Sequence, residues 1–456
     1  MRLLIAVFQS LFLFSLPAFA QLAINVEPAD RLWMEDPEIT VMGAEPGAPV
    51  TIIATLTDDK GQVWSSRGEY FADSNGQIEL DTDASLSGTY RGVDVHGPFW
   101  SLLPMTPEQV RTLTPEQVDP LAPRTPQLSF VGSTDVQIIT RSDKSVASAD
   151  QNVGFLSVGV RVEDVDEAGL RGKFLTPIGD EPRPAILVVT GSGGGVNLRT
   201  AALLASKGFH VFALAHFNYP GRPPELKDIP LEYFETAIGW LRQKAGTDKI
   251  GLTGLSRGGE GALLIASLYP DHIGAVVSGV PSNVLWGGCC TADAVKAVAW
   301  RLNGKPLPIS PYPFKKGEEG FEYLSDSVGF RDFYMPGMAA SSDSNPATIA
   351  VENIDAPILL ISGAADMMWP SSIAAQRIEQ RLKEKDYIHS FESVVYPSAG
   401  HHVTSDVFVT IRSSEVVHPV TKTKMYLGGL PEANAANSRD AFRRKVAFFK
   451  KYLAIE

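Results

Sequence analysis

The sequence predicts two folded domains, an N-terminal all-β sandwich and a C-terminal α/β domain with a doubly wound, mainly parallel sheet. Short strand-like stretches with turn residues fill residues 21–104. After about residue 163, near-continuous apolar runs alternate with helix-length segments. A chain of 456 residues with 44% hydrophobic and 20% charged residues has ordinary globular composition and is long enough for two domains. We place the sandwich at residues 21–162 and the α/β domain at residues 163–456.

The first 20 residues form a segment of their own. Arg2 precedes an apolar run over residues 3–14, and Ala-Phe-Ala ends the segment at residues 18–20. This order is typical of a cleavable secretory signal, so we expect an exported protein, periplasmic or extracellular, whose mature chain begins at Gln21. A membrane anchor is the alternative, but this run and every later one are shorter than the ~18 apolar residues of a transmembrane helix. We expect no integral membrane segment in the mature chain.

Turn residues divide the sandwich domain. The sequences at residues 58–61 and at Asn75-Gly76 stand between strand-like stretches, and each predicts a β-hairpin. Five prolines within residues 105–127 indicate a surface connection. A last strand-like stretch at residues 155–162 either completes the sandwich or leads into the next domain.

The α/β domain is predicted element by element from its hydrophobic periodicity. Strands are expected at residues 185–190, 211–215, 250–253, 275–278, 358–361 and 393–396. Helices are expected at residues 231–244, 258–269, 373–385 and 439–453. Residues 285–348, rich in Gly, Pro and Ser, are too long for a simple connection between two strands and are expected to form a cap over the site.

Residues 254–258 read Gly-Leu-Ser-Arg-Gly between a predicted strand and a predicted helix. This is the G-x-S-x-G pattern in the context that exposes a nucleophilic serine. The turn is so sharp that a side chain at either glycine would clash, and it lifts the Ser256 hydroxyl out at the carboxyl edge of the sheet. We predict Ser256 as the nucleophile, against the plainer interpretation of a chance serine in a glycine-rich turn.

A serine hydroxyl needs a base to accept its proton, and the base needs a carboxylate to orient it. The expected chain order is Ser, acid, His. Asp366 follows the predicted strand at residues 358–361 and lies at the correct end of the sheet, whereas Asp355 precedes that strand. His401 and His402 follow the next strand. We predict Asp366 as the acid and His401 as the base, with His402 as its neighbour.

Acyl transfer also requires backbone N–H groups that bind the oxyanion of the tetrahedral intermediate. One is expected at Arg257, the residue after the nucleophile. The second is expected from the loop at residues 191–195, Gly-Ser-Gly-Gly-Gly, where missing side chains let the backbone approach a substrate. We predict the N–H groups of Gly193 and Gly194, with no choice between them.

Composition and spacing exclude other classes of site. A net charge of −12 disfavours a nucleic-acid partner. The glycine loop fails the dinucleotide pattern, since Val196 and Leu198 stand at its sixth positions, and no His, Cys and carboxylate cluster has metal spacing. We therefore expect a small-molecule acyl substrate and chemistry without metal or cofactor. Cys289 and Cys290 are adjacent, and we expect two free thiols because a disulfide between neighbours is strained.

The mature chain resembles the family of acyl-CoA thioesterases and bile acid-CoA:amino acid N-acyltransferases over nearly its whole length. The matching segments are INVEPADRLWMED at residues 24–36, AALLASKGFHVFALAHFNY at 201–219, LEYFE at 231–235, GLSRGGE at 254–260 and YPSAGH at 396–401. The resemblance implies an immunoglobulin-like β-sandwich followed by an α/β-hydrolase domain. It also implies Ser256 as nucleophile, Asp366 as acid and His401 as base. Amide-forming members carry cysteine as nucleophile, so a serine implies hydrolysis of an acyl thioester.

The sequence departs from this family in two respects. Residues 403–409 replace a Pro-rich aromatic segment, and coenzyme A is intracellular whereas this chain is expected to be exported. An exported carboxylesterase or amide hydrolase on the same scaffold therefore remains open, and so does a non-catalytic binding protein, although an intact Ser, Asp and His set argues against the latter.

The predicted cap also bears on the leaving group. Its basic residues are Arg301, Lys305, Lys315 and Lys316, and its acidic residues include Glu318, Glu319, Glu322, Asp326 and Asp332. This balance predicts a solvated face, so we expect the nucleotide part of coenzyme A to add little to catalysis.

Overall fold

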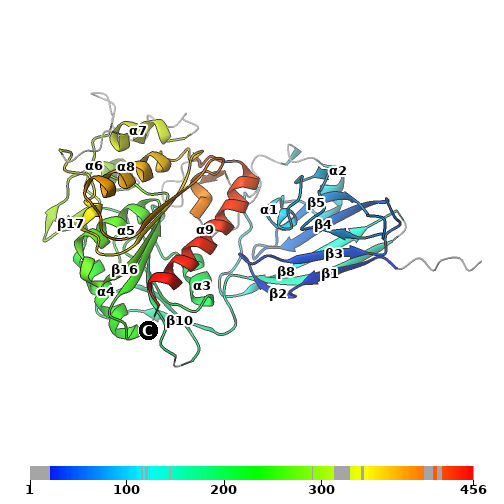
Figure 1. The fold of residues 1–456 in the computed structure, drawn as a ribbon, viewed down its shortest axis with the longest axis horizontal. Helices are drawn as coiled ribbons and strands as arrows, with labels where there is room; N and C mark the ends of the chain where they lie inside the picture. The colour runs from blue at the N-terminus through cyan, green and yellow to red at the C-terminus, as the bar shows by residue number, and fades with distance from the viewer. Residues whose placement is uncertain are drawn as a thin grey trace, which may run out of the picture.

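The computed structural model describes residues 21–113, 117–118, 122, 124–143, 145–179, 181–289, 291–312, 329–339, 344–404, 414–417 and 424–454. The expected secretory signal, residues 1–20, lies outside this part. Figure 1 shows the β-sandwich beside the α/β domain, with helix α9 (Pro431–Tyr452) on the side of the α/β domain that faces the sandwich. Among the described helices, none is both long and apolar enough to cross a bilayer.

The N-terminal domain consists of two sheets packed face to face. The larger sheet has the order β2-β9-β8-β4-β5-β7 and the smaller the order β1-β3-β6. Their strands are β1 Ala23–Glu27, β2 Asp30–Leu32, β3 Glu38–Met42, β4 Pro49–Thr57, β5 Val63–Phe71, β6 Ile78–Glu79, β7 Ser87–Gly88, β8 Ser133–Arg141 and β9 Val146–Gly154. Two short helices, α1 (Gly97–Trp100) and α2 (Pro107–Thr112), lie in the connection between β7 and β8.

Of the two predicted hairpins, the structure confirms the first and contradicts the second. Residues 58–61 do join β4 to β5 in an antiparallel pair, and Gly61 takes a φ of 79° in the turn. The hairpin at Asn75-Gly76 is wrong, because β5 pairs with β4 and β7 in one sheet, whereas β6 pairs with β3 in the other. The turn therefore carries the chain between sheets. A Cβ on Gly76 would lie 2.1 Å from the carbonyl oxygen of Ala44, so the glycine serves this crossing.

The α/β domain contains an eight-stranded sheet in the order β10-β11-β13-β12-β15-β16-β19-β20. The strands are β10 Val160–Val165, β11 Gly172–Pro177, β12 Ala185–Val189, β13 His210–Leu214, β15 Ile250–Leu255, β16 Ile273–Gly279, β19 Ile358–Gly363 and β20 Phe391–Tyr396. The six from β13 to β20 run parallel and correspond to the six predicted strands, two of which were predicted one residue too long at the C-terminal end. β10 and β11 form an antiparallel edge, and the predicted domain boundary after residue 162 falls inside β10.

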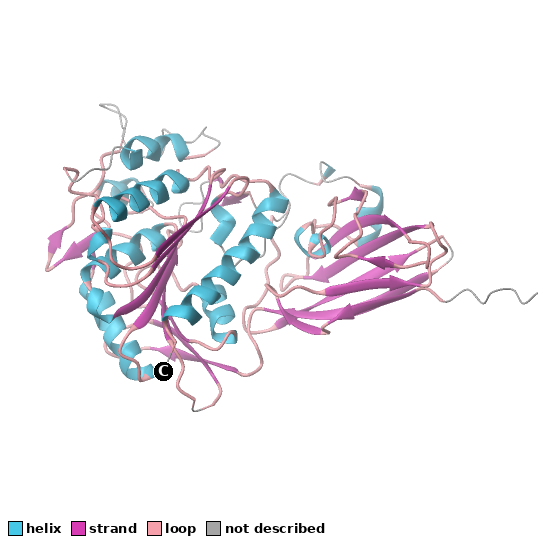
Figure 2. Cartoon of the chain, in the orientation of Figure 1, coloured by secondary structure: helices cyan, strands magenta, loops and turns pink. Residues whose placement is uncertain are grey.

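Helices cover both faces of this sheet, as Figure 2 shows. They are α3 Leu198–Ser206, α4 Glu232–Ala245, α5 Arg257–Leu268, α8 Ser371–Glu384 and α9. Alternate residues of β12 divide between the two layers. Ile186 and Val188 pack in the core that includes α3 and α9, while Leu187 and Val189 pack in the core that includes α4, α5 and α8. A strand buried on both faces reads as a continuous apolar run, which is why the sequence predicted it.

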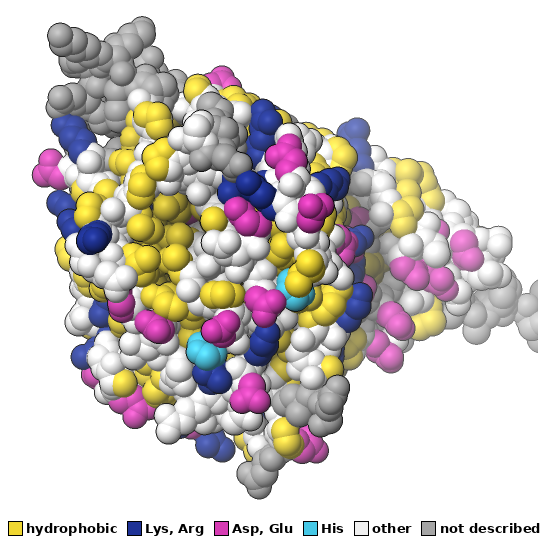
Figure 3. All heavy atoms as spheres, turned by 60° about the vertical axis from the view of Figure 1, so that its left-hand side comes forward, with side chains coloured by type: hydrophobic (Ala, Val, Ile, Leu, Met, Phe, Trp, Pro, Cys, Tyr) yellow, Lys and Arg dark blue, Asp and Glu magenta, His cyan; other side chains and the backbone are white. Residues whose placement is uncertain are grey.

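The predicted cap, residues 285–348, lies between β16 and β19. Its described elements are α6 Ala292–Lys296, β17 Trp300–Leu302, β18 Lys305–Pro306 and α7 Arg331–Ala339, and β17 pairs with β14 (Ile229–Pro230). Residues 313–328 and 340–343 lie outside the described part. Figure 3 shows Lys and Arg side chains interspersed with Asp and Glu on this side of the molecule, around a band of hydrophobic side chains.

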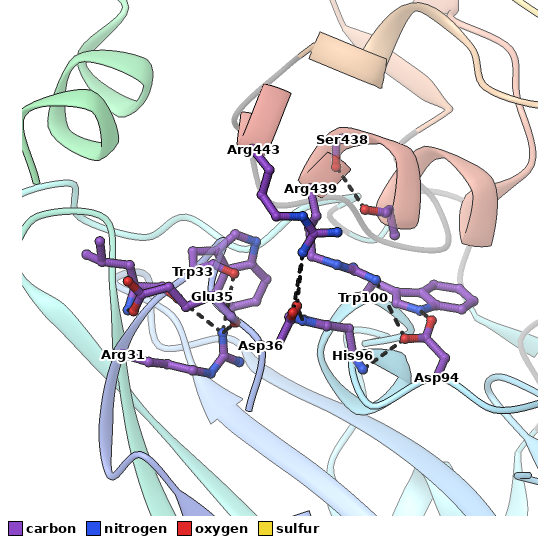
Figure 4. A network of polar contacts seen from close by, with 12 residues as sticks. Arg31, Trp33, Glu35, Asp36, Asp94, His96, Trp100, Ser438, Arg439 and Arg443 are labelled. Atoms are coloured by element: carbon purple, nitrogen blue, oxygen red, sulfur yellow. Dashed lines mark hydrogen bonds and ion pairs between the residues drawn. The ribbon is translucent and has the colours of Figure 1, made fainter. Parts of the chain in front are cut away.

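A polar network joins α9 to the sandwich (Figure 4). Nε2 of His96 lies 2.8 Å from Asp36 Oδ1, and Arg443 Nη1 on α9 lies 3.3 Å from Asp36 Oδ2. A second arginine of α9, Arg439, pairs with Asp94 at 3.6 Å. Two aspartates of the sandwich are thus paired with two arginines of the other domain, beside a histidine side chain that is only 5% exposed.

Candidate active site

Ser256 lies at the sharp turn between β15 and α5, near the middle of the parallel sheet. Its φ of 59° and ψ of −125° are unusual for a residue with a side chain. A Cβ on Gly254 would lie 2.3 Å from the carbonyl oxygen of Gly258, and a Cβ on Gly258 would lie 2.6 Å from that of Val189. The tight packing confirms that both flanking positions need glycine, as the motif predicted.

Asp366 and His401 follow β19 and β20, the last two strands of the sheet, and come together there. His401 Nδ1 lies 2.9 Å from Asp366 Oδ2, and the Asp366 side chain is completely buried. The other carboxylate oxygen, Oδ1, accepts hydrogen bonds from the backbone N–H groups of Met368 and Trp369. The Trp369 ring meets the His401 ring edge to face, with centroids 5.9 Å apart. The imidazole is therefore held on two sides.

Ser256 and His401 line one cavity of about 510 Å³, and His402 lines it as well. Between the described side chains of Ser256 and His401 there is no hydrogen bond in this structure. Such contacts often tighten only in a substrate complex. The structure thus brings the three predicted residues to one site and joins two of them directly.

The predicted oxyanion donors differ in their hydrogen bonding. Arg257 is the first residue of α5, where a backbone N–H has no partner within the helix. The N–H of Gly194 donates to the carbonyl oxygen of Gly191 at 3.1 Å, which commits it to the loop. Gly193 donates no backbone hydrogen bond to any described residue, and it lines the cavity. Arg257 and Gly193 are the better placed pair.

A buried ion pair lies directly behind the nucleophile. Arg257 Nη1 donates to Glu260 Oε2 at 2.7 Å, and Trp300 Nε1 donates to Glu260 Oε1 at 3.0 Å. Arg257 Nη2 also donates to the carbonyl oxygens of Trp286 and Gly287. Burial raises the pKa of Glu260 to about 7, and the positive charge of Arg257 opposes this shift. The pair ties the first turn of α5 to the start of the cap.

The cavity has one apolar wall and one polar wall. The apolar wall is formed by Tyr312, Phe330, Tyr334, Met368, Trp369 and Met425. The polar wall is formed by the glycine loop and the start of α3, together with residues 287–289 of the cap. The expectation of two free thiols is wrong for Cys289, which is disulfide-bonded. The only other cysteine of the chain, Cys290, lies outside the described residues.

The cations at the cavity are not those considered from the sequence. Arg301 Nε pairs with Asp228 at 2.7 Å, Lys305 is exposed, and neither lines the cavity. Lys315 and Lys316 lie outside the described residues. Instead, Arg199 of α3 lines the cavity together with Arg257. A signal was present in the sequence, because Arg199 is the only charged residue between residues 184 and 206.

Family models match both domains of the chain. Residues 34–167 match the acyl-CoA thioester hydrolase/BAAT N-terminal region, and residues 229–455 match the BAAT/acyl-CoA thioester hydrolase C-terminal region. Acyl-coenzyme A thioesterase 1 from Mus musculus is 30% identical over 95% of this chain and 97% of its own length. The chain belongs to the acyl-CoA thioester hydrolase/BAAT family.

Other members show similar agreement. Mitochondrial acyl-coenzyme A thioesterase 2 from Homo sapiens is 30% identical over 96% of this chain and 86% of its own length. The peroxisomal succinyl-coenzyme A thioesterase from Mus musculus is 29% identical over 94% of this chain and 96% of its own. The family resemblance seen in the sequence is therefore confirmed, and the chain has the two-domain architecture that this resemblance implied.

Proposed function

We propose that this protein is a serine hydrolase that cleaves acyl thioesters through an acyl-enzyme on Ser256. The observation that carries the proposal is the Asp366–His401 pair at 2.9 Å, which shares a cavity with a serine on a strained strand-to-helix turn. The names of the relatives, acyl-coenzyme A thioesterases, support a thioester as the substrate. No metal or organic cofactor is needed for this reaction.

In the proposed mechanism, Ser256 Oγ attacks the thioester carbonyl carbon while His401 Nε2 accepts the hydroxyl proton. Asp366 accepts the Nδ1–H of His401, which fixes the tautomer whose Nε2 is free to act as base. The backbone N–H groups of Arg257 and Gly193 hold the oxyanion. When the C–S bond breaks, His401 returns its proton to the departing sulfur. Water then attacks the acyl-serine with His401 again as base, which releases the acid and restores the hydroxyl.

A substrate panel distinguishes thioester hydrolysis from two alternatives, a carboxylesterase and an amide hydrolase. The purified residues 21–456 are assayed with one acyl group carried on coenzyme A, on N-acetylcysteamine and on p-nitrophenol, and with an amide of the same acid. We expect both thioesters to be cleaved and the amide to be spared. Cleavage of the oxygen ester alone would point to the carboxylesterase, and rapid cleavage of the amide to an amide hydrolase.

Ser256→Ala provides the test of mechanism. We expect a loss of at least ~10⁴-fold in kcat with the fold intact, because removal of a member of such a triad commonly costs that much. A fluorophosphonate probe should label the wild-type chain at Ser256 and leave the variant unlabelled. An unlabelled and inactive wild type would support the non-catalytic binding protein instead.

A further inference from the structure

Arg199 stands in the first turn of α3, directly after the glycine loop, and lines the same cavity as Ser256. Two of the described arginines contribute to the cavity wall, and they differ in the partners of their guanidinium groups. The guanidinium of Arg257 is occupied by Glu260 and by two backbone carbonyl oxygens. The guanidinium of Arg199 has no hydrogen bond or ion pair to any described residue.

The surroundings of Arg199 are aromatic rather than acidic. Its guanidinium carbon lies 5.0 Å from the ring centroid of Phe130 and 5.6 Å from that of Phe155. The Nε atom is buried and has no hydrogen-bond partner. Burial lowers the pKa of Arg199, and no neighbouring acid raises it. Since an arginine stays protonated in proteins, the side chain is a cation without a counter-ion in the described surroundings.

Such an arrangement is unusual, because buried charges are normally paired. Two other arginines with little exposure, one buried and one part-buried, do have partners for their guanidinium groups. Arg31 donates to Gln151 and to three backbone carbonyl oxygens, and Arg381 forms a two-point pair with Glu352. Among the described residues, Arg199 stacks on two aromatic rings and has no acidic partner, and its planar set of donors is the kind that binds carboxylate and phosphate.

We propose that Arg199 is the anion-binding residue of this cavity and pairs with a negatively charged group of the substrate. The group is either a phosphate of the thiol part or a carboxylate of the acyl part. The proposal rests on the proposed function, since it assigns Arg199 to the substrate of the Ser256 site. It also assigns the cation to α3 rather than to the cap.

The test compares three substrates with the same acyl length in the wild type, Arg199→Met and Arg199→Lys. Butyryl-N-acetylcysteamine is neutral, butyryl-CoA adds phosphates, and succinyl-N-acetylcysteamine adds a carboxylate. For Arg199→Met we expect kcat/KM to fall roughly 10- to 100-fold on the substrate that uses the site, mainly through KM, and to change less than about threefold on the neutral substrate. Arg199→Lys, which keeps the charge, should recover part of the loss.

The pattern of losses identifies the anion. A loss confined to butyryl-CoA assigns a phosphate, and a loss confined to succinyl-N-acetylcysteamine assigns a carboxylate. Equal losses on all three substrates would mean that Arg199 only packs against Phe130 and Phe155, and an unchanged kcat/KM on both charged substrates would equally overturn the proposal. Arg222→Met is the matched control, because Arg222 also stacks on a ring, that of Tyr233 at 3.7 Å, but does not line the cavity.

Binding to the Ser256→Ala protein gives a readout that needs no turnover. Isothermal titration compares Ser256→Ala with the double variant that also carries Arg199→Met. The double variant should bind either butyryl-CoA or succinyl-N-acetylcysteamine more weakly. If Arg199→Met weakens the binding of neither compound, Arg199 is not the anion-binding residue, even if the enzyme is an active thioesterase. A different result would refute the proposed function and keep the anion site. In that case the wild type cleaves no thioester, yet Arg199→Met still weakens the binding of one of the two anionic compounds.

Discussion

Ser371 Oγ donates a hydrogen bond of 2.6 Å to Asp366 Oδ2, the same oxygen that lies 2.9 Å from His401 Nδ1. Ser371 is the first residue of α8, and both it and Asp366 are completely buried. Together with the two backbone N–H groups on Oδ1, this bond leaves the carboxylate one orientation. Ser371 is therefore a positioning residue for the proposed acid.

We expect Ser371→Ala to lower kcat about tenfold with little change in KM, because one hydrogen bond to a charged group is lost and the carboxylate can turn away from His401. Ser372→Ala is the matched control, since Ser372 is its buried neighbour in the same turn and does not bond Asp366. Steady-state kinetics on both variants make the comparison. Equal effects of the two changes would remove Ser371 from the positioning of the acid.

The two adjacent histidines are expected to behave differently. His401→Ala should match Ser256→Ala within about tenfold in kcat, because members of one catalytic unit are not additive. His402→Ala should be far milder, since His401, not His402, faces Asp366. Both variants are compared by kcat after their folding has been checked by circular dichroism. The opposite ranking would transfer the role of base to His402.

The sequence predicted the parallel sheet well and parts of its surroundings poorly. Strands buried on both faces are continuous apolar runs, so their positions were visible. Helix α3 was not predicted, because it has only nine residues and contains a continuous buried run at residues 200–205, and periodicity does not identify so short a run. The prediction of a hairpin at Asn75-Gly76 was wrong, because a turn sequence indicates that the chain reverses direction but does not indicate which strands pair with each other.

The site shows a similar division. Ser256, Asp366 and His401 each follow a strand of the sheet, so local sequence and chain order were enough to bring them together. Ser371 and Glu260 bond to residues near them in the sequence, Asp366 and Arg257, but no motif marks them. The second partner of Glu260, Trp300 of the cap, meets it only in the folded chain. Arg199 carried a visible charge, but its lack of a partner among the described residues appears only when Phe130 and Phe155 are seen to surround it.

Glu260 offers a test of the buried ion pair. Glu260→Ala should lower the free energy of unfolding by about 3–5 kcal/mol, because Arg257 would be left as a buried charge without its partner. Glu260→Gln, which keeps an acceptor for Trp300, should cost less. Urea unfolding followed by tryptophan fluorescence measures both. Glu35→Ala is a control, since its partner Lys207 lies at a part-exposed site. A loss no greater than in the control would show that the pair contributes little.

Export is a separate prediction from the N-terminal sequence. We propose that cleavage after Ala20 gives a mature protein that begins at Gln21, because the preceding residues have the charge, apolar run and small residues of a secretory signal. Intact mass and N-terminal peptides of the protein from its native host identify the first residue. Recovery of a chain that still carries residues 1–20 would contradict export by this route.

The polar network between the domains predicts how stability depends on pH. Burial lowers the pKa of His96 to about 4, helped by the positive charges of Arg439 and Arg31 and opposed by its hydrogen bond to Asp36. That hydrogen bond lowers the pKa of Asp36 to about 2. The other charged groups labelled in the network are Glu35, Asp94 and Arg443 (Figure 4). In mildly acidic solution the unfolded chain is therefore protonated at His96 while the folded chain is not, whereas Asp36 affects stability only below pH 4.

Between pH 6.5 and pH 4 the unfolded chain binds a proton at His96 that the folded chain does not bind, so the free energy of unfolding falls as the pH falls through this window. At pH 5 the loss relative to pH 7 should be about 2 kcal/mol greater in the wild type than in His96→Gln, which has no proton to bind. Asp36 does not contribute there, because its window lies below an unfolded pKa near 3.8. His272→Gln, on the turn before β16 and outside this network, is the matched histidine control. Urea unfolding of the three proteins at pH 7 and pH 5 measures the difference, and parallel losses in the wild type and His96→Gln would show that the buried histidine is not what destabilises the protein in acid.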